Sequence, residues 1–232
     1  MKGYSSDKIR NIVLLGHGST GKTTFLEAGL LNTKVISRLG KVESGNTVSD
    51  YEKMEIEKGY TINQTLVPVE YKGTKLNFID TPGFFDFAGE ARAALSTGAT
   101  AIIMVDASSG IQVGTEKAWD LVKEYNSPTF FIINKIDKDN VELDDVISAI
   151  QDKFGSACVT LDDKDALDEA VAAADEELME KFFEGEAFTD EEFAHGLATG
   201  IHNGDIMPIM TMSALTGEGV DVVLDSLCKY VP

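Results

Sequence analysis

The sequence predicts an α/β fold in which a mostly parallel central sheet is flanked by helices. Two continuous apolar runs, residues 101–105 and 129–133, have the composition of strands buried on both faces, and a helical pattern over residues 114–125 lies between them. A third apolar run, residues 9–15, leads into a glycine-rich turn and a helical pattern over residues 23–31. This alternation of strands and helices is typical of a parallel sheet.

The glycine-rich turn, residues 16–23 (GHGSTGKT), matches the spacing G-x-x-x-x-G-K-[ST] at every fixed position. In such a P-loop, backbone N–H groups and the start of the next helix face a phosphate chain. Lys22 would reach the β and γ oxygens, and the Thr23 hydroxyl would bind Mg²⁺. The expected nucleotide contacts of this segment are His17, Gly18, Ser19, Thr20, Gly21, Lys22, Thr23 and Thr24.

Residues 33–63 lose strong apolar periodicity, so we expect a long mobile segment. Residues 49–52 (SDYE) have capping-box spacing and predict a short charged helix after them. Near the end of the segment, the Thr61 hydroxyl could swing onto the metal when a γ-phosphate is present. Taken alone, Thr61 would be an ordinary strand residue, so this role depends on the rest of the pattern.

Two alternating stretches, residues 66–71 and 75–79, predict a hairpin whose second strand runs into residues 80–83 (DTPG). An acidic residue at this strand end can hold Mg²⁺ through water, and the Gly83 N–H can bind a γ-phosphate. The D-x-x-G pattern alone is weak evidence for a phosphate site. It becomes informative because it follows the P-loop in the chain. The expected metal ligands are Thr23, Thr61 and Asp80.

Residues 134–137 (NKID) follow one predicted strand, and residues 213–215 (SAL) follow a later one, residues 206–212. Ligands of open α/β sheets bind at these strand ends. The Asp137 carboxylate can accept the N1–H and 2-amino donors of guanine, a pair that adenine lacks, while the Lys135 stem covers the ring. A backbone N–H of the later turn would hold the base oxygen. The expected base contacts are Asn134, Lys135, Asp137, Ser213, Ala214 and Leu215, which predicts GTP and GDP as ligands.

The composition and charge limit the class of protein. A chain of 232 residues with 43% hydrophobic residues can bury a full core and is most simply one domain. It has neither 18 consecutive apolar residues nor a signal-peptide pattern, so we expect a cytoplasmic protein with no membrane contact. The two cysteines, Cys158 and Cys228, are expected to be free buried thiols.

The net charge of −19 is concentrated in the second half of the chain. Residues 1–137 carry 15 Lys and Arg against 16 Asp and Glu, whereas residues 138–232 carry 5 against 23. This acidity argues against nucleic-acid binding by the second half through phosphate neutralisation. It predicts a solvated face or a docking surface for a protein partner, and the solvated face is the simpler interpretation.

The stretches GHGSTGKTT, EKGYTI, DTPGFFDFAGE, NKID and SALTGEGV together resemble the GTP-binding (G) domain of translation factors, most closely elongation factor G and its paralogues. The resemblance covers nearly the whole chain and implies a P-loop NTPase fold and a cytoplasmic, ribosome-associated GTPase. It implies that residues 1–232 are a GTP-binding domain, monomeric in isolation, from a longer protein whose further domains supply most contacts with the ribosome and ribosomal RNA.

Two positions depart from the family pattern. Elongation factor G reads G-H-x-D-x-G-K-T and D-T-P-G-H, whereas this chain has Ser19 for the aspartate and Phe84 for the histidine. The resemblance gives that histidine a role in positioning the attacking water and associates the aspartate with a monovalent cation. Phenylalanine offers no hydrogen bond, and losing such a group costs roughly 10²–10⁴ in rate. Of the expected catalytic positions, Lys22, Gly83 and Phe84, the last is therefore impaired, and we expect binding to survive with slow hydrolysis.

Residues 155–205 are more than a minimal fold needs between a helix over residues 141–154 and the strand at 206–212. Apolar residues from Leu167 to Phe183 predict one helix, and a capping pattern at Thr189 predicts a second. The segment resembles the family's G′ insertion without its usual strand-rich part. The resemblance makes the ribosomal stalk protein a candidate partner of this acidic insertion.

Four functions are compatible with these motifs to different degrees. The leading one is a translational GTPase of the elongation factor G type, which couples nucleotide state to ribosome binding and translocation. The second is a GTP-responsive binding module with little or no hydrolysis, which Ser19 and Phe84 favour. A ribosomal protection factor is less favoured because such relatives keep the histidine, and the NKID quartet disfavours a P-loop kinase.

Overall fold

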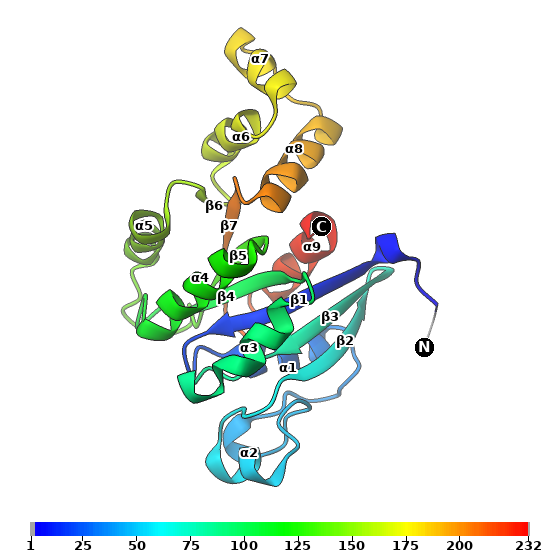
Figure 1. The fold of residues 1–232 in the computed structure, drawn as a ribbon, viewed down its shortest axis with the longest axis vertical. Helices are drawn as coiled ribbons and strands as arrows, with labels where there is room; N and C mark the ends of the chain where they lie inside the picture. Colours follow the sequence, from blue (N-terminus) through cyan, green and yellow to red (C-terminus); the bar gives the residue numbers. More distant parts are fainter. Residues whose placement is uncertain (1–2, 232) are drawn as a thin grey trace.

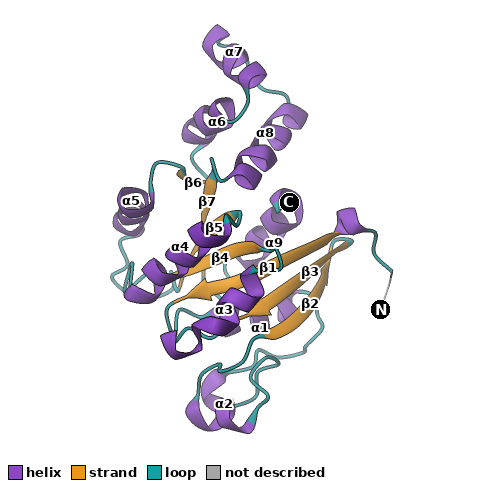
Figure 2. Cartoon of the chain, viewed as in Figure 1, coloured by secondary structure: helices purple, strands orange, loops and turns teal. Residues whose placement is uncertain are grey.

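The computed structural model describes residues 3–231. Within them, seven strands form one sheet in the order β2-β3-β1-β4-β5-β7-β6, and only the β2–β3 pair is antiparallel (Figures 1 and 2). The fold is therefore the α/β architecture that the sequence predicts. The strands are β1 (Ile9–Gly16), β2 (Thr65–Tyr71), β3 (Thr74–Asp80), β4 (Thr100–Asp106), β5 (Thr129–Asn134), β6 (Cys158–Thr160) and β7 (Met207–Met212).

Helices cover both faces of the sheet. One face packs on α1 and α9 through a core that includes Phe25, Leu26 and Leu224, and the other packs on α3, α4 and α5. Successive residues of β1 divide between these two cores, with Ile12 in one and Val13 in the other, as the alternation of a strand requires. The helices are α1 (Lys22–Asn32), α2 (Lys53–Lys58), α3 (Ala88–Leu95), α4 (Val113–Tyr125), α5 (Leu143–Phe154), α6 (Lys164–Ala173), α7 (Glu176–Glu184), α8 (Asp190–Asn203) and α9 (Val220–Tyr230).

The predicted helix between Leu167 and Phe183 is wrong as a single element. The structure has two helices, α6 and α7, and α7 begins after Asp175, whose side chain accepts the N–H groups of Glu177 and Leu178. The helical spacing of apolar residues continues across the break between α6 and α7, so this pattern does not reveal the break. The N-cap residue Asp175 is the sequence signal that indicates it. Figure 1 shows α6, α7 and α8 extending beyond the sheet at one end of the molecule.

The extra segment also begins later than expected. Cys158–Thr160 form β6, which pairs in parallel with β7 at the edge of the main sheet, so these residues of the 155–205 range belong to the central fold. A three-residue strand gives too short a pattern to be read from sequence.

The cap of the short charged helix α2 lies three residues later than the capping pattern predicts. Glu52 is its N-cap and forms a capping box with Glu55, whereas residues 49–52 were expected to form it. Ser49 is unavailable because its hydroxyl donates to Asp80 Oδ2 at 3.0 Å. Among residues 3–231, no helix is both long and apolar enough to cross a membrane.

Candidate nucleotide site

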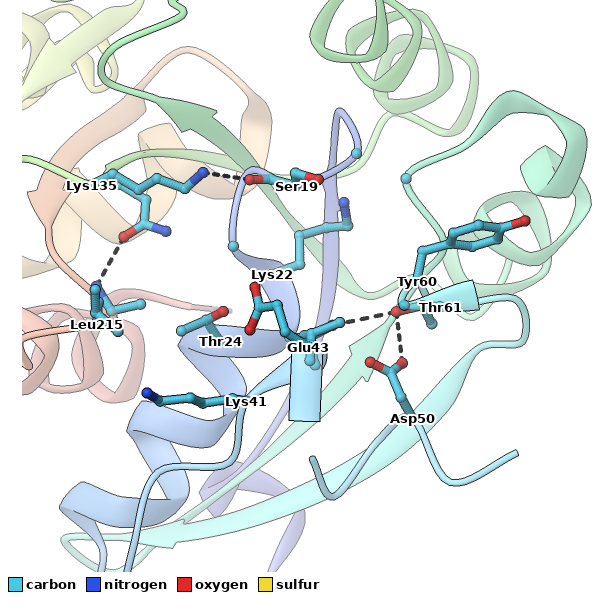
Figure 3. Close-up of a pocket in the computed structure, with 18 of the residues that line it drawn as sticks. Ser19, Lys22, Thr24, Lys41, Glu43, Asp50, Tyr60, Thr61, Lys135 and Leu215 are labelled. Carbon is cyan, nitrogen blue, oxygen red and sulfur yellow. Dashed lines mark hydrogen bonds between the residues drawn. The ribbon is translucent and has the colours of Figure 1, made fainter. Parts of the chain in front are cut away.

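A cavity of about 480 Å³ lies where the carboxyl ends of β1, β5 and β7 meet the segment before β2 (Figure 3). It brings together most of the residues that the motifs predict. The predicted residues that line it are Gly18, Ser19, Gly21, Lys22, Thr23, Thr24, Thr61, Gly83, Phe84, Asn134, Lys135, Asp137, Ala214 and Leu215.

The lining does not include four predicted residues, which are His17, Thr20, Asp80 and Ser213. The Thr20 hydroxyl donates to the His17 carbonyl at 3.0 Å, which closes the P-loop turn. The Ser213 hydroxyl accepts the Thr216 N–H at 3.2 Å and shapes the turn after β7. The Thr20 and Ser213 hydroxyls therefore stabilise loops of the site.

Lys22 occupies the centre of the P-loop. Its Nζ donates to the carbonyls of Gly16 and His17, at 3.1 and 3.0 Å. Burial lowers the pKa of this amine to about 8, and the nearby Asp80 carboxylate opposes the shift. A Cβ on Gly83 would lie 2.7 Å from Lys22 Nζ and 2.8 Å from the Gly18 backbone, so only glycine lets this turn approach the P-loop so closely.

The three predicted metal ligands converge beside Lys22. The Thr23 hydroxyl donates to Asp80 Oδ2 at 2.8 Å and lies 3.3 Å from the Thr61 hydroxyl, which donates to Asp50 Oδ1 at 2.8 Å. Burial raises the pKa of Asp80 to about 6, although Thr23 and Lys22 act to lower it.

Asp80 Oδ1 is buried and has no hydrogen-bond partner among the described residues. Such an oxygen is costly to bury unless something binds it. Mg²⁺ prefers carboxylate and hydroxyl oxygens, which is the donor set that Thr23, Thr61 and Asp80 offer. The residues present therefore fit a magnesium site.

The base end of the cavity is built by direct bonds between strand ends. Asn134 Nδ2 donates to the Thr20 carbonyl at 2.8 Å, and Asn134 Oδ1 accepts the Ala214 N–H at 2.9 Å. One side chain thus joins the P-loop to the turn after β7. Asp137 is exposed and faces the cavity from the turn after β5. The Ala214 N–H already donates to Asn134 Oδ1, so a bond from this N–H to a base oxygen would have to share the same hydrogen.

Phe84 lies at the opposite end, on the turn after β3. Phe84 is 43% exposed, and its ring centroid is 4.7 Å from that of Tyr60, which lines the cavity beside Thr61. A Cβ on Gly18 would lie 3.4 Å from the Phe84 ring. Phe84 therefore connects the turn after β3 to the segment before β2, through Tyr60, and to the P-loop, through Gly18.

Sequence reasoning missed several residues that position these groups. Glu27 on α1 is buried, and its carboxylate accepts the N–H groups of Gly40 and Val48 at 2.9 and 2.6 Å, which anchors the segment before α2. Asp106 and Lys138 form an ion-pair cluster with Lys135. A lone acidic residue inside an apolar pattern was the available signal for Glu27, and an acidic strand end was the signal for Asp106.

Comparisons with known proteins agree with this geometry. The family model of the elongation factor Tu GTP-binding domain matches residues 7–232. A crystal structure of a protein from Thermus thermophilus superposes with a TM-score of 0.90 at 26% identity and covers 98% of this chain.

A crystal structure of the bacterial selenocysteine-specific elongation factor EF-Sec has a TM-score of 0.56 at 20% identity over 96% of this chain, which is a likeness of fold. This chain spans 41% and 28% of the lengths of those two proteins. The chain belongs to the elongation factor Tu GTP-binding domain family, the guanine-nucleotide-binding domains of translation factor GTPases.

Proposed function

We propose that this chain is the Mg²⁺-dependent GTP- and GDP-binding domain of an elongation factor G-like translation factor, in which GTP hydrolysis is slow. The observation that carries the proposal is the convergence of the P-loop, Thr61, Asp80, the NKID quartet and the SAL turn around one cavity. Each motif is weak alone, and their shared cavity supports one common ligand.

Base recognition would fall to the turn after β5. The Asp137 carboxylate would accept the two donors on one edge of guanine, and the Lys135 stem would cover the ring, because both residues line the same end of the cavity. Adenine presents no such donor pair to a carboxylate, so ATP would leave this acceptor unpaired at a considerable cost.

The phosphates would lie over the P-loop. Lys22 would exchange its bonds to the loop carbonyls for bonds to phosphate oxygens, which would favour its charged form. Thr23, Thr61 and Asp80 would hold Mg²⁺, whose charge would offset that of the phosphates. Gly83 approaches Lys22 and the P-loop closely, so its N–H would bind the same terminal phosphate.

Slow hydrolysis follows from the chemistry of Phe84. A phenylalanine ring can neither orient a water molecule nor take its proton, and the ring packs against Tyr60 and Gly18. A GTP-responsive switch that hydrolyses little or no GTP is therefore the second candidate function, and the same aromatic contact is the observation that favours it.

The remaining proposals concern the whole protein, of which this chain would be a part. Helices α6–α8 would be a shortened G′-type insertion, and their acidic surface would be a docking site for the ribosomal stalk protein. Further domains would supply most contacts with the ribosome and its RNA, and the nucleotide state would control ribosome binding and translocation. The isolated domain would be a monomer in the cytoplasm.

Calorimetry tests the proposal directly. The purified chain with Mg²⁺ should bind GDP and GTP and should leave ATP unbound under the same conditions. Equal affinity for ATP and GTP would refute the guanine assignment. Phosphate release by the full-length protein, measured with and without ribosomes, separates the two candidate functions: stimulated turnover supports a GTPase, and nucleotide binding without turnover supports a switch.

A further inference from the structure

Asp106 is the last residue of β4 and lies beside the base end of the cavity. Its side chain is only 8% exposed, and in the sheet it pairs with Asn134, the first residue of the NKID quartet. The Ala107 N–H donates to the Asn134 carbonyl at 2.8 Å, so the ends of β4 and β5 are fixed to each other. A carboxylate this deeply placed needs strong partners to remain charged.

Both oxygens of the Asp106 carboxylate have partners, and Lys138 Nζ donates to both, at 3.5 Å from Oδ1 and 3.3 Å from Oδ2. Oδ1 accepts the backbone N–H and the hydroxyl of Ser108, at 2.9 and 2.7 Å, which fixes the carboxylate plane. Oδ2 accepts Lys135 Nζ at 2.7 Å and Lys138 Nζ at 3.3 Å. Burial disfavours the charge, but the hydrogen bonds from Lys135 and Ser108 outweigh it and lower the pKa of Asp106 to about 2.

The two lysines stand on either side of Asp137, which carries the proposed base recognition. Lys135 Nζ also donates to the Ser19 carbonyl at 2.6 Å, so its stem spans from the turn after β5 to the P-loop (Figure 3). The Lys138 N–H donates to the Lys135 carbonyl at 3.2 Å, and the Lys138 ammonium donates to the Ser108 hydroxyl at 2.8 Å. Lys135 and Lys138, the two ends of the turn over residues 135–138, are therefore both attached to the Asp106 carboxylate.

The backbone of this turn needs such support. Lys135 has a φ of 69°, and Ser19, whose carbonyl it binds, has a φ of 61°. Both are left-handed conformations that side-chain-bearing residues adopt rarely and that persist where the surroundings hold them. An ion pair to a fixed carboxylate is the strongest contact that the structure gives the Lys135 side chain.

We propose that Asp106 is a positioning residue for guanine recognition, which acts through Lys135 and Lys138 to hold Asp137 in place before a nucleotide binds. The inference deepens the proposed function and rests on it. The P-loop and the NKID quartet would then be joined at two points, by Asn134 to Thr20 and by the Asp106-anchored Lys135 to Ser19.

The test is Asp106→Asn in the full-length protein, with the affinity and dissociation rate of fluorescent GDP as readouts. Asparagine keeps an oxygen for Ser108 and replaces Oδ2, the nearer acceptor of both lysines, by a donor. We expect GDP binding about tenfold weaker, mainly through faster dissociation. The preference for GDP over inosine diphosphate, which lacks the 2-amino group, should also fall, because Asp137 would be less well placed.

Three comparisons separate positioning from a general loss of structure. Asp225→Asn on α9 removes an exposed ion pair to Lys72 and should leave both readouts unchanged. Lys138→Met changes a half-exposed side chain, so it should fold normally, and it should weaken GDP binding by about threefold. In a Lys135→Met, Lys138→Met background, Asp106→Asn should have less than about a twofold effect.

Unchanged GDP affinity and base preference in both Asp106→Asn and Lys138→Met would overturn the inference and leave the proposed function standing. The inference would equally fail if Asp106→Asn costs as much in the double-lysine background as in the wild type. A wild-type protein that binds no GDP would instead contradict the proposed function and this inference with it.

Discussion

The two ends of the cavity are held together in different ways. At the base end, Asn134 and Lys135 bond directly to backbone carbonyls of the P-loop, and both lie at the end of a buried strand. At the other end, Thr61 and Phe84 lie on loops that contact the P-loop through a hydroxyl pair and an aromatic ring. In the proposed function, base recognition would therefore depend on side chains fixed at strand ends, whereas sensing of the terminal phosphate would depend on loops outside the sheet.

Asp137→Asn is the change with the largest expected effect, and it acts only on the base end. Asparagine replaces one acceptor of the guanine donors by a donor, so GDP affinity should fall roughly 10²- to 10⁴-fold. Xanthine nucleotides, whose 2-oxo group accepts that donor, should become the preferred ligands. Calorimetry with both nucleotides measures this, with Asp139→Asn, an exposed neighbour outside the cavity lining, as the control.

Removal of Mg²⁺ tests the other end. Chelation should weaken GTP binding to the wild type by roughly 10- to 100-fold, because Lys22 alone would then face the terminal phosphates. In Asp80→Asn, the GTP affinities of chelated and Mg²⁺-loaded samples should differ much less than in the wild type. The preference of this variant for guanine should be unchanged. A variant that still gains full affinity from Mg²⁺ would show that Asp80 is no part of the metal site.

The raised pKa of Asp80 predicts the pH dependence of the same step. Below its pKa of about 6 the Asp80 carboxyl is protonated, so Mg²⁺ must displace a proton to bind. The gain in GTP affinity that Mg²⁺ provides should therefore fall by up to roughly tenfold for each pH unit below 6. Above pH 6 the carboxyl is already charged, and the gain should be flat. The nucleotide's own phosphate titrates nearby, so the quantity to measure is the difference between wild type and Asp80→Asn.

Glu27→Gln should have the smallest effect and should be confined to the segment before α2. Glutamine keeps one acceptor for two N–H donors, so amide exchange at Gly40 and Val48 should quicken by roughly five- to tenfold in nucleotide-free protein. Exchange at Asn134 should be unaffected if the base end is independently held. Glu57→Gln on the exposed side of α2 is the matched control, and faster exchange in it as well would remove the special role of Glu27.

Sequence patterns predicted the sheet and the cavity for clear physical reasons. Doubly buried strands need continuous apolar runs, and phosphate and base contacts need fixed spacings on single turns, so both signals are local. Glu27, Asp50 and Asp106 each bind partners that are distant in the sequence, which are Gly40 and Val48, Thr61, and Lys135 respectively. Asp106 meets Lys135 because β4 and β5 pair in one register, and a register cannot be read from either strand alone.

In the proposed function, the cavity binds guanine nucleotides while Phe84 limits hydrolysis. The most direct test is single-turnover GTP hydrolysis on ribosomes by the full-length wild type and by Phe84→His, with GTP affinity measured on the same samples. Hydrolysis should be roughly 10²-fold faster in Phe84→His than in the wild type, and the GTP affinities of the two should agree within about twofold. Ser19→Asp combined with Phe84→His shows whether the two positions act as a unit. A wild type that hydrolyses GTP as fast as Phe84→His would contradict the claim, because another group would then position the water.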